Sequence, residues 1–387
     1  MYPSKKYNIL VDINGMVWGF GQNDFGQLGL GYESDTEQIQ MVTGLPRIKK
    51  AICGDIFSVL IDENGSVWTC GDNTYGQLGL GTTRNVSKFQ RIENIPQVIS
   101  ASCGAYHTTL VDINGDVWTC GRGDNYQLGY DLKEFGEVLF PYYKENGSQN
   151  WTTIPLGINM LMENRPKIIK VTCGPESTYL IDELGLVWVF GKSSRSMEFG
   201  LGGGYEIVKQ PTQIMTINNI KDIICGEEHT VFIDHRGNTW GTGRLGSLGI
   251  PVRGKHYSWI PRRIENLPPI IYATCGTYNT LYLDNNYDVW VAGSNTFHKL
   301  LFETFNVRTP EMIPNLKCID LISGSGYALF IDMEGNIWGI GDNSLGQLGL
   351  SIDEYPEVKE LTRIMDIPPV VGFEDIRRKF KTKNARY

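Results

Sequence analysis

Basic and aromatic side chains gather in two stretches of the sequence, and these residue types could bind anions or nucleic acid. The first stretch holds Arg253, Lys255, His256, Tyr257, Trp259, Arg262 and Arg263. The second is the tail of residues 374–387, with Arg377, Arg378, Lys379, Lys381, Lys383 and Arg386. Cationic groups neutralise phosphates, and aromatic rings stack on bases. A solvated linking loop and a hydrated chain end are the alternative interpretations of these two stretches.

A third stretch, residues 131–165, carries aromatic residues among polar and charged ones. They are Phe140, Tyr142, Tyr143 and Trp151. Exposed aromatic side chains often anchor protein partners, and long loops in compact domains are often functional. Asp124, which precedes the stretch, is a further candidate partner contact. The alternatives are a local extension that packs on its own repeat unit, and a turn role for Asp124 and Asn125.

Motifs for catalysis or metal binding are absent from the sequence. There is no CxxC, HExxH or EF-hand pattern, no GxSxG elbow and no P-loop. Residues 241–246 match GxGxxG, but a dinucleotide site needs a helix to follow, and Pro251 comes soon after instead. His107 and His229 recur at one repeat position, which favours a structural role. We therefore expect no enzyme, no cofactor, no metal and no small-molecule substrate.

The sequence consists largely of copies of one repeat unit, and the fold of these copies positions the residues named above. The centre of the unit reads Asp, two residues, Gly, one residue, Val or Ile, and Trp, with Thr239 and Tyr287 as the exceptions. The copies begin at Asp12, Asp62, Asp112, Asp182, Asp234, Asp284 and Asp332. Seven tryptophans stand in register six residues after these aspartates. The third and fourth copies are 70 residues apart (182 minus 112), and the extra length is the 131–165 insertion. Repeats of this length indicate a solenoid or a propeller.

Each unit predicts short strands joined by tight turns. In the unit of residues 95–129, apolar runs at Val98–Cys103, His107–Val111 and Val117–Cys120 predict three strands. Asn114-Gly115 between two of them indicates a hairpin, since both residue types tolerate a positive φ. The unit then closes on a glycine turn such as NTYGQLG at residues 73–79. The fold class is therefore all-β, with little helix.

The run CGAYHTTLVDINGDVWTCG (Cys103 to Gly121), with closures such as GQLG, resembles the repeat of the regulator-of-chromosome-condensation family. The resemblance covers about residues 7 to 373. It implies a seven-bladed β-propeller with four-stranded blades. Tyr7–Asp12 matches the second strand of a unit, and Ile367–Val371 matches the first. We expect these N- and C-terminal strands to pair in one blade and close the ring.

Composition and segment types limit which partners and which cell compartment we expect. The formal charge is −8, so a broad cationic surface is not expected. Five of the eight cysteines share one repeat position and lie in different blades, so we expect buried free thiols rather than disulfides. No signal peptide or membrane span is evident, which favours an intracellular protein, nuclear or cytoplasmic. The expected domains are a single propeller, 1–373, and a basic tail, 374–387.

The function implied by the resemblance is a non-catalytic binding platform. The family's founding protein displaces nucleotide from the GTPase Ran, so a Ran-like small GTPase is the first expected partner and guanine-nucleotide exchange the first expected activity. The 131–165 insertion lies at a place broadly similar to the founding protein's projecting hairpin. The alternatives are a structural role on nucleic acid, in chromatin binding or genome packaging, and an adaptor in ubiquitin or signalling assemblies.

Overall fold

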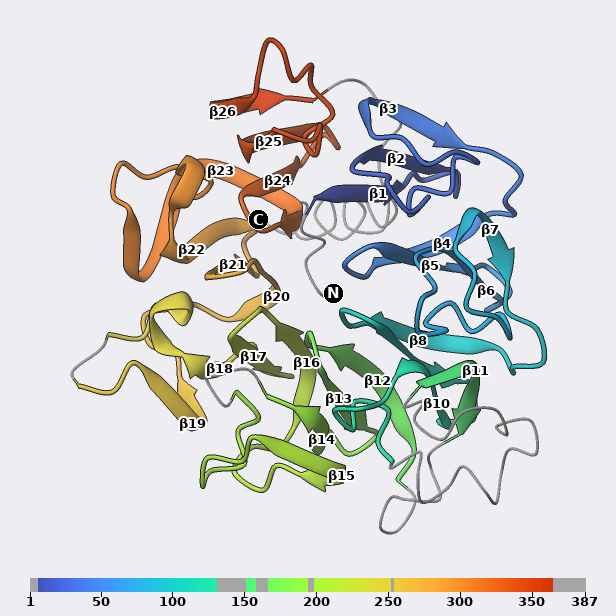
Figure 1. Cartoon of the computed structure of the whole chain (residues 1–387). Helices are drawn as coiled ribbons and strands as arrows, with labels where there is room; N and C mark the ends of the chain where they lie inside the picture. The colour runs from blue at the N-terminus through green and yellow to red at the C-terminus, as the bar shows by residue number, and fades with distance from the viewer. Residues whose placement is uncertain (1–5, 131–150, 158–165, 194–197, 252–253, 365–387) are drawn as a thin grey trace, which may run out of the picture.

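The chain folds into a ring of seven β-sheet blades around a central axis, the last two of which share one long strand (Figure 1). The computed structural model describes residues 6–130, 151–157, 166–193, 198–251 and 254–364. Within them, no helix is long and apolar enough to cross a membrane. The expected all-β, seven-bladed propeller is confirmed.

The blades follow one another in sequence order. Blade one holds β1 (Tyr7–Val11), β2 (Val17–Gly21) and β3 (Thr36–Val42); blade two holds β4 (Ile48–Cys53), β5 (Phe57–Asp62), β6 (Val67–Gly71) and β7 (Val86–Arg91). Blade three holds β8 (Val98–Cys103), β9 (His107–Asp112), β10 (Val117–Arg122) and β11 (Trp151–Gly157); blade four holds β12 (Ile168–Cys173), β13 (Ser177–Asp182), β14 (Val187–Lys192) and β15 (Ile207–Gln213).

The last three blades contain two short 3-10 helices and one shared strand. Blade five holds β16 (Ile220–Cys225), β17 (His229–Asp234), β18 (Thr239–Arg244), the helix η2 (Leu245–Leu248) and β19 (Tyr257–Arg263). Blade six holds β20 (Ile270–Cys275), β21 (Asn279–Asp284), β22 (Asp288–Ser294) and the helix η3 (Thr296–His298), and blade seven holds β24 (Tyr327–Asp332), β25 (Ile337–Asp342) and β26 (Glu357–Arg363). The long strand β23 (Asn306–Ser323) serves both, because its first part pairs with β22 and its last part with β24.

The repeated aspartate organises each hairpin between the second and third strands. Asp62 Oδ1 accepts hydrogen bonds from the backbone N–H of Asn64 and of Ser66, both at 2.9 Å, while Oδ2 accepts one from Trp68 Nε1 at 3.1 Å. The same aspartate–tryptophan bond recurs in five other blades. In blade five, Asn238 Nδ2 donates to Asp234 Oδ2 instead. The repeated motif thus encodes a hairpin turn in which the aspartate carboxylate accepts three hydrogen bonds.

In the hairpin turn of residues 112–116, only the glycine adopts a positive φ. Gly115 has a φ of 87°, but Asn114 is not among the residues of positive φ. The Gly115 N–H bonds the Asp112 carbonyl, and the Asp112 N–H bonds the Asp116 carbonyl. This is a type I turn followed by a left-handed glycine, in which only the glycine needs a positive φ. The predicted hairpin is confirmed, and of its two residues that tolerate a positive φ only Gly115 adopts one.

Adjacent blades are joined by a repeated hydrogen bond. In five blades, the second residue of the second strand donates a side-chain proton to a carbonyl in the closing turn of the preceding blade. Thr108 Oγ1 bonds the Gln77 carbonyl at 2.7 Å, and Thr280 Oγ1 bonds the Ser247 carbonyl at 2.9 Å. Between the last blade and the first, Asn8 Nδ2 donates to the Gln347 carbonyl at 2.7 Å. The first and last blades are therefore in direct contact.

Apolar side chains between blade faces form the core. One cluster joins Leu10 and Phe20 of blade one to Leu329 and Leu348 of blade seven, so the ring is packed at its seam. The expected pairing strand, Ile367–Val371, lies outside the described residues. Blade one accordingly shows three described strands.

All eight cysteines are buried and free, as expected. Burial raises the pKa of Cys53 to about 11 and that of Cys120 to about 12. The thiols therefore behave as small apolar side chains that fill space between the blades.

Candidate functional site

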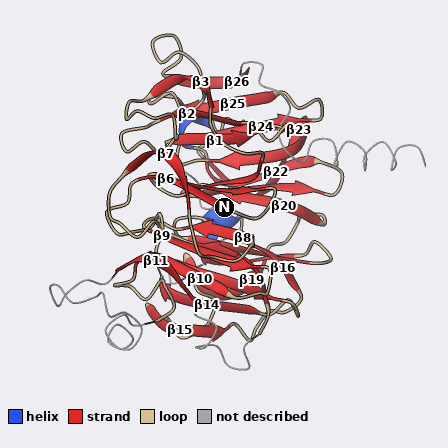
Figure 2. Ribbon diagram, turned by 90° about the vertical axis from the view of Figure 1, so that its right-hand side faces the viewer, coloured by secondary structure: helices blue, strands red, loops and turns tan. Residues whose placement is uncertain are grey.

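The connections between strands lie on two opposite faces of the ring, because the strands of each blade are antiparallel (Figure 2). One face holds the bends between first and second strands and the closing turns after third strands; we call it the loop face. The other holds the Asp–Gly hairpins and the links between blades; we call it the hairpin face. Regular hairpins make the hairpin face uniform, whereas the loop face varies from blade to blade.

A network of charged and aromatic side chains spans blades two to four on the loop face. Arg122, at the end of β10, lies between Asp124 Oδ2 at 2.7 Å and Glu176 Oε1 at 3.6 Å. Lys192, at the end of β14, approaches the other Glu176 oxygen at 3.9 Å. The Arg122 guanidinium also lies 5.4 Å from the ring centre of Tyr75. We call these residues, together with Tyr106, the polar arc.

The polar arc is ordered by its own contacts. The rings of Tyr75 and Tyr106 meet edge to face with centroids 5.2 Å apart. Burial alone would lower the pKa of Arg122, but the hydrogen bond to Asp124 and the charge of Glu176 raise it above its ordinary value. Arg122, Asp124 and Glu176 each keep between 26% and 33% of their side-chain surface exposed. The arc is therefore a preformed surface that remains accessible to a partner.

Blades five and six carry a related arrangement. Arg244 Nη1 lies 3.2 Å from Glu228 Oε2, and its guanidinium lies 4.6 Å from the ring centre of Tyr278. Arg122, Lys192 and Arg244 occupy the same repeat position, where blades two and seven carry Asp72 and Asp342. The loop face is thus acidic on one side of the ring and basic on the other at this position.

Residues 131–150 of the aromatic insertion join the closing turn of blade three, which holds Asp124 of the polar arc, to the outer strand β11. Tyr130 is the last described residue before this segment. Trp151 follows it and begins β11, and the backbone of Trp151 pairs with that of Arg122. The outer strand of blade three therefore falls inside the range of residues 131–165. Phe140, Tyr142 and Tyr143 lie outside the described residues, as does the Trp151 side chain. Asp124, by contrast, lies in the polar arc and in the closing turn of the blade.

The structure brings part of the 253–263 basic cluster together on the outer strand of blade five. Lys255 Nζ lies 5.1 Å from the ring centre of Trp259, whose side chain is 42% exposed. Arg263 Nη2 donates to Asn238 Oδ1 at 3.0 Å, and Tyr257 and Arg262 are exposed on the same strand. Arg253 and the basic tail, with Arg377, Arg378, Lys379, Lys381 and Lys383, lie outside the described residues.

The two recurring histidines are buried. His107 Nε2 lies 3.0 Å from Thr178 Oγ1, and His229 Nε2 lies 3.0 Å from Thr280 Oγ1. Burial lowers the pKa of each to about 3, so both are neutral at physiological pH. In the described part of the chain, no group of three or more His, Cys, Asp or Glu side chains is placed to hold a metal ion.

Reasoning from the sequence missed Arg122, Glu176 and Lys192. The signal for Arg122 and Lys192 was the change of charge sign at the residue after the recurring third-strand glycine, where blade two carries Asp72. A comparison of the units position by position could have found it. The contact between Arg122 and Glu176 crosses from one blade to the next, so no single unit reveals it.

Family models and known proteins agree with this geometry. The model described as the regulator of chromosome condensation (RCC1) repeat matches residues 14–61, 64–111, 114–181 and 239–283. A second RCC1 repeat model matches residues 49–77 and 98–127.

Curated relatives share part of their length with this chain. Protein RCC2 from Homo sapiens is 27% identical over 204 residues, covering 52% of this chain and 34% of that protein. Regulator of chromosome condensation from Xenopus laevis is 27% identical over 236 residues, covering 54% and 55%. The probable E3 ubiquitin-protein ligase HERC6 from Homo sapiens is 28% identical over 199 residues, covering 49% and 19%. The chain thus matches less than two thirds of the length of each.

Among solved structures, Prp20p from Saccharomyces cerevisiae superposes with a TM-score of 0.76 at 15% identity, covering 97% of both chains. That structure is described together with the binding of Prp20p to Gsp1p and histones. Human WBSCR16 superposes with a TM-score of 0.71 at 16% identity, covering 94% of both chains. At such identities the likeness shows a shared fold.

Proposed function

Because this chain belongs to the family of regulator of chromosome condensation (RCC1) repeat proteins, we propose that it is a non-catalytic platform whose loop face binds a protein partner. The first candidate partner is a Ran-like small GTPase, and the first candidate activity is guanine-nucleotide exchange. The proposal places the protein inside the cell, nuclear or cytoplasmic, where reduced thiols such as its eight free cysteines are usual.

The polar arc is the observation that carries this proposal. Arg and Tyr side chains dominate the binding energy of many protein interfaces. Arg122 is already held by Asp124, Glu176 and two tyrosine rings, so little side-chain freedom remains to be lost on binding. Residues 131–150 of the aromatic insertion connect the closing turn of blade three to its own outer strand, so they would extend the same binding surface.

The buried side chains favour a non-catalytic role. His107 and His229 are neutral and have no access to solvent, so they are poor candidates for general bases. Burial raises the pKa of the Cys275 thiol to about 12, which keeps it protonated and unreactive. Nucleotide exchange requires neither kind of group. A platform that binds the nucleotide-free GTPase more tightly than the loaded form shifts the population towards release.

Nucleotide release tests the proposal. A Ran-like GTPase loaded with fluorescent GDP is mixed with the protein in the presence of excess unlabelled nucleotide. We expect faster release with the unaltered protein and slower release with Glu176→Lys, which breaks the polar arc. Glu63→Lys is the matched control, because Glu63 is an exposed, ion-paired glutamate on the hairpin face. Failure of the unaltered protein to accelerate release or to bind the GTPase would overturn the proposal.

Nucleic-acid binding is the second candidate, and the stacking of Lys255 on Trp259 favours it. An exposed cation beside an exposed ring suits a phosphate and a base. Binding to double-stranded DNA should then weaken steeply with salt. It should also weaken on deletion of residues 374–387 and with Trp259→Ala. Absence of DNA binding at low salt would remove this candidate.

An adaptor role in ubiquitin or signalling assemblies is the remaining alternative. Similar relatives include a probable E3 ubiquitin-protein ligase and the serine/threonine-protein kinase Nek9 from Mus musculus. The matched segment is 19% of the former and 21% of the latter. In this role the loop face would bind a ligase or kinase component, and GDP release from the GTPase would be unchanged.

A further inference from the structure

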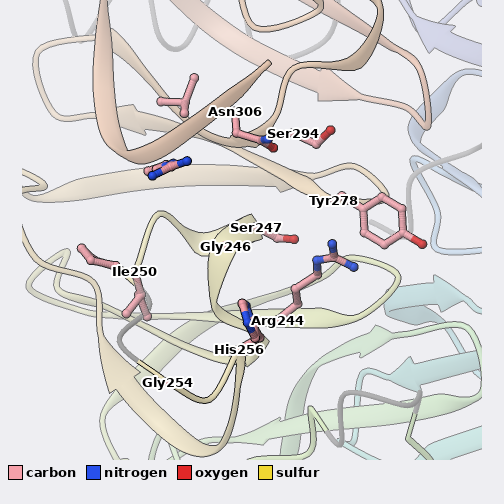
Figure 3. A pocket seen from close by; sticks show the side chains of 12 residues that line it. Arg244, Gly246, Ser247, Ile250, Gly254, His256, Tyr278, Ser294 and Asn306 are labelled. Carbon is pink, nitrogen blue, oxygen red and sulfur yellow. The ribbon is translucent and has the colours of Figure 1, made fainter. Parts of the chain in front are cut away.

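A cavity of about 700 Å³ opens between blades five and six (Figure 3). Blade five contributes Arg244 from the end of β18, Ser247 from η2, and His256. Blade six contributes Tyr278 from a loop-face bend and Ser294 from the end of β22, and Arg308 lines it from β23. The cavity is separate from the polar arc, which lies on blades two to four.

The cavity exists because the closing turn of blade five is short. Five positions separate Arg244 from Gly249, whereas seven separate the equivalent Asp72 from Gly79. In blade two, the Gln77 side chain fills the turn and donates to Asp72 Oδ2 at 2.6 Å. Ser247 stands at the position of Gln77, since Thr280 bonds its carbonyl as Thr108 bonds that of Gln77. A shorter turn and a smaller side chain leave the space open.

The lining of this cavity is cationic. Arg244 and Arg308 line it, and the described lining residues include no carboxylate. Glu228 engages Arg244 through one nitrogen, at 3.2 Å, and Tyr278 supports the guanidinium from one side. Because a guanidinium has five N–H donors, most of those on Arg244 remain for a ligand. Figure 3 shows Arg244 and Tyr278 side by side at the cavity.

A buried hydroxyl without a partner lies at this cavity. The Ser247 side chain belongs to a residue that is 1% exposed, and its Oγ has no hydrogen-bond partner. An unsatisfied buried hydroxyl costs free energy, and a ligand oxygen would relieve that cost. Ser294 and Asn306 add further polar groups to the wall.

We propose that this cavity binds a phosphate monoester, carried by a phosphorylated serine or threonine side chain of a partner protein. Arginine forks match phosphate oxygens in geometry and charge, and serine hydroxyls complete the set of donors. The volume exceeds that of a phosphate group, so there is room for the group that carries it. A free nucleoside monophosphate offers the same chemistry from another source.

Calorimetric titration of the full chain tests the proposal with O-phosphoserine, AMP and serine as probes. We expect O-phosphoserine to bind and serine not to bind. Arg308→Ala and Ser247→Ala should each weaken O-phosphoserine binding at least about tenfold, a loss typical of a removed charged or polar contact. Arg236→Ala is the matched control, since Arg236 is an exposed arginine in the hairpin of the same blade and lies outside the cavity.

Stability measurements separate a binding role of Ser247 from a structural one. Because its hydroxyl has no partner, Ser247→Ala should leave the unfolding midpoint unchanged or raise it while it weakens phosphate binding. Tighter binding of O-phosphoserine than of AMP supports the phosphorylated side chain, and the reverse order overturns that source. No binding at about 10 mM, or binding that neither variant weakens, overturns the site itself.

Discussion

The Asn8 side chain closes the ring by donating a hydrogen bond from Nδ2 to the Gln347 carbonyl at 2.7 Å. Its Oδ1 accepts a second hydrogen bond from Tyr327 Oη at 3.0 Å. The two partners belong to blade seven and Asn8 to blade one, so one buried amide links the two ends of the described propeller. The same bond joins other neighbouring blades, where serine or threonine replaces asparagine.

Asn8→Ala should destabilise the whole ring. The substitution leaves the Gln347 carbonyl and the Tyr327 hydroxyl buried without this partner, at a cost of about 3 kcal/mol in the free energy of unfolding. Urea unfolding followed by tryptophan fluorescence measures the loss. Asn64→Ala, at an exposed hairpin asparagine, is the matched control and should change stability by less than about 0.5 kcal/mol. Equal stability of the two variants would contradict the role of Asn8.

Asp62→Ala tests the aspartate–tryptophan hairpin. The carboxylate accepts three hydrogen bonds, so its removal leaves three donors unsatisfied. We expect a loss of about 2–4 kcal/mol in the free energy of unfolding, measured by urea denaturation. The neighbouring Glu63→Ala removes only an exposed ion pair with Arg47 and should cost less than about 1 kcal/mol. A small effect of Asp62→Ala would show that the motif is dispensable.

Removing a glycine from the closing turn of blade one should destabilise the protein, and adding one to the closing turn of blade six should stabilise it. Gly26 has a φ of 73°, and a Cβ there would lie 2.5 Å from Ser87 Cα in blade two. Gly26→Ala should therefore destabilise the protein by more than about 2 kcal/mol. His298 occupies the same turn position with a φ of 58°, and His298→Gly should raise the free energy of unfolding by up to about 1 kcal/mol. Thermal unfolding of both variants checks the signs, and destabilisation by His298→Gly would refute the strain argument.

Stability should fall as the solution is acidified below about pH 6.5, because two buried histidines must take up protons on unfolding. Burial lowers the pKa of His107 and of His229 from 6.5 to about 3. The unfolded chain thus binds more protons than the folded chain between these values, and folding weakens as pH falls. At about pH 5 the expected loss is roughly 2 kcal/mol for each histidine.

Urea unfolding at about pH 7 and about pH 5 measures this loss. The double variant His107→Asn and His229→Asn removes both groups, and asparagine is the natural residue at the equivalent Asn279. Its stability should depend less on pH over the same range. An unchanged pH dependence in the double variant would contradict the assignment.

The fold could be predicted from the sequence because its local rules repeat. The aspartate–tryptophan spacing indicates a hairpin in every unit, and seven such units leave few architectures other than a ring. The Asn-Gly pairs predicted the hairpins but not their turn type, because such pairs also occur in type I turns where only the glycine is left-handed. The closing turn of blade six differs in sequence from that of blade two but keeps its structure. Asn295 Oδ1 accepts a hydrogen bond from the Leu300 N–H at 2.8 Å, as Asn73 Oδ1 does from the Leu78 N–H at 3.0 Å.

The candidate sites were harder to predict from the sequence than the fold, because they depend on contacts between blades. Asp124 was recognised, but its partners Arg122 and Glu176 were not, since Glu176 is supplied by the next blade. The cavity between blades five and six depends on a shortened turn facing another blade, which no single motif encodes. Phe140, Tyr142 and Tyr143 remain predicted partner contacts.

Hydrogen–deuterium exchange of the protein, with and without nucleotide-free Ran-like GTPase, tests the central claim most directly. The proposal predicts slower exchange in the loop-face segments 104–106, 123–130 and 174–176 when the GTPase is present, and unchanged exchange in the hairpins 62–66 and 112–116. Slower exchange confined to the hairpin face, or none anywhere under conditions where the GTPase is in excess, would contradict the account of the loop face as the binding surface.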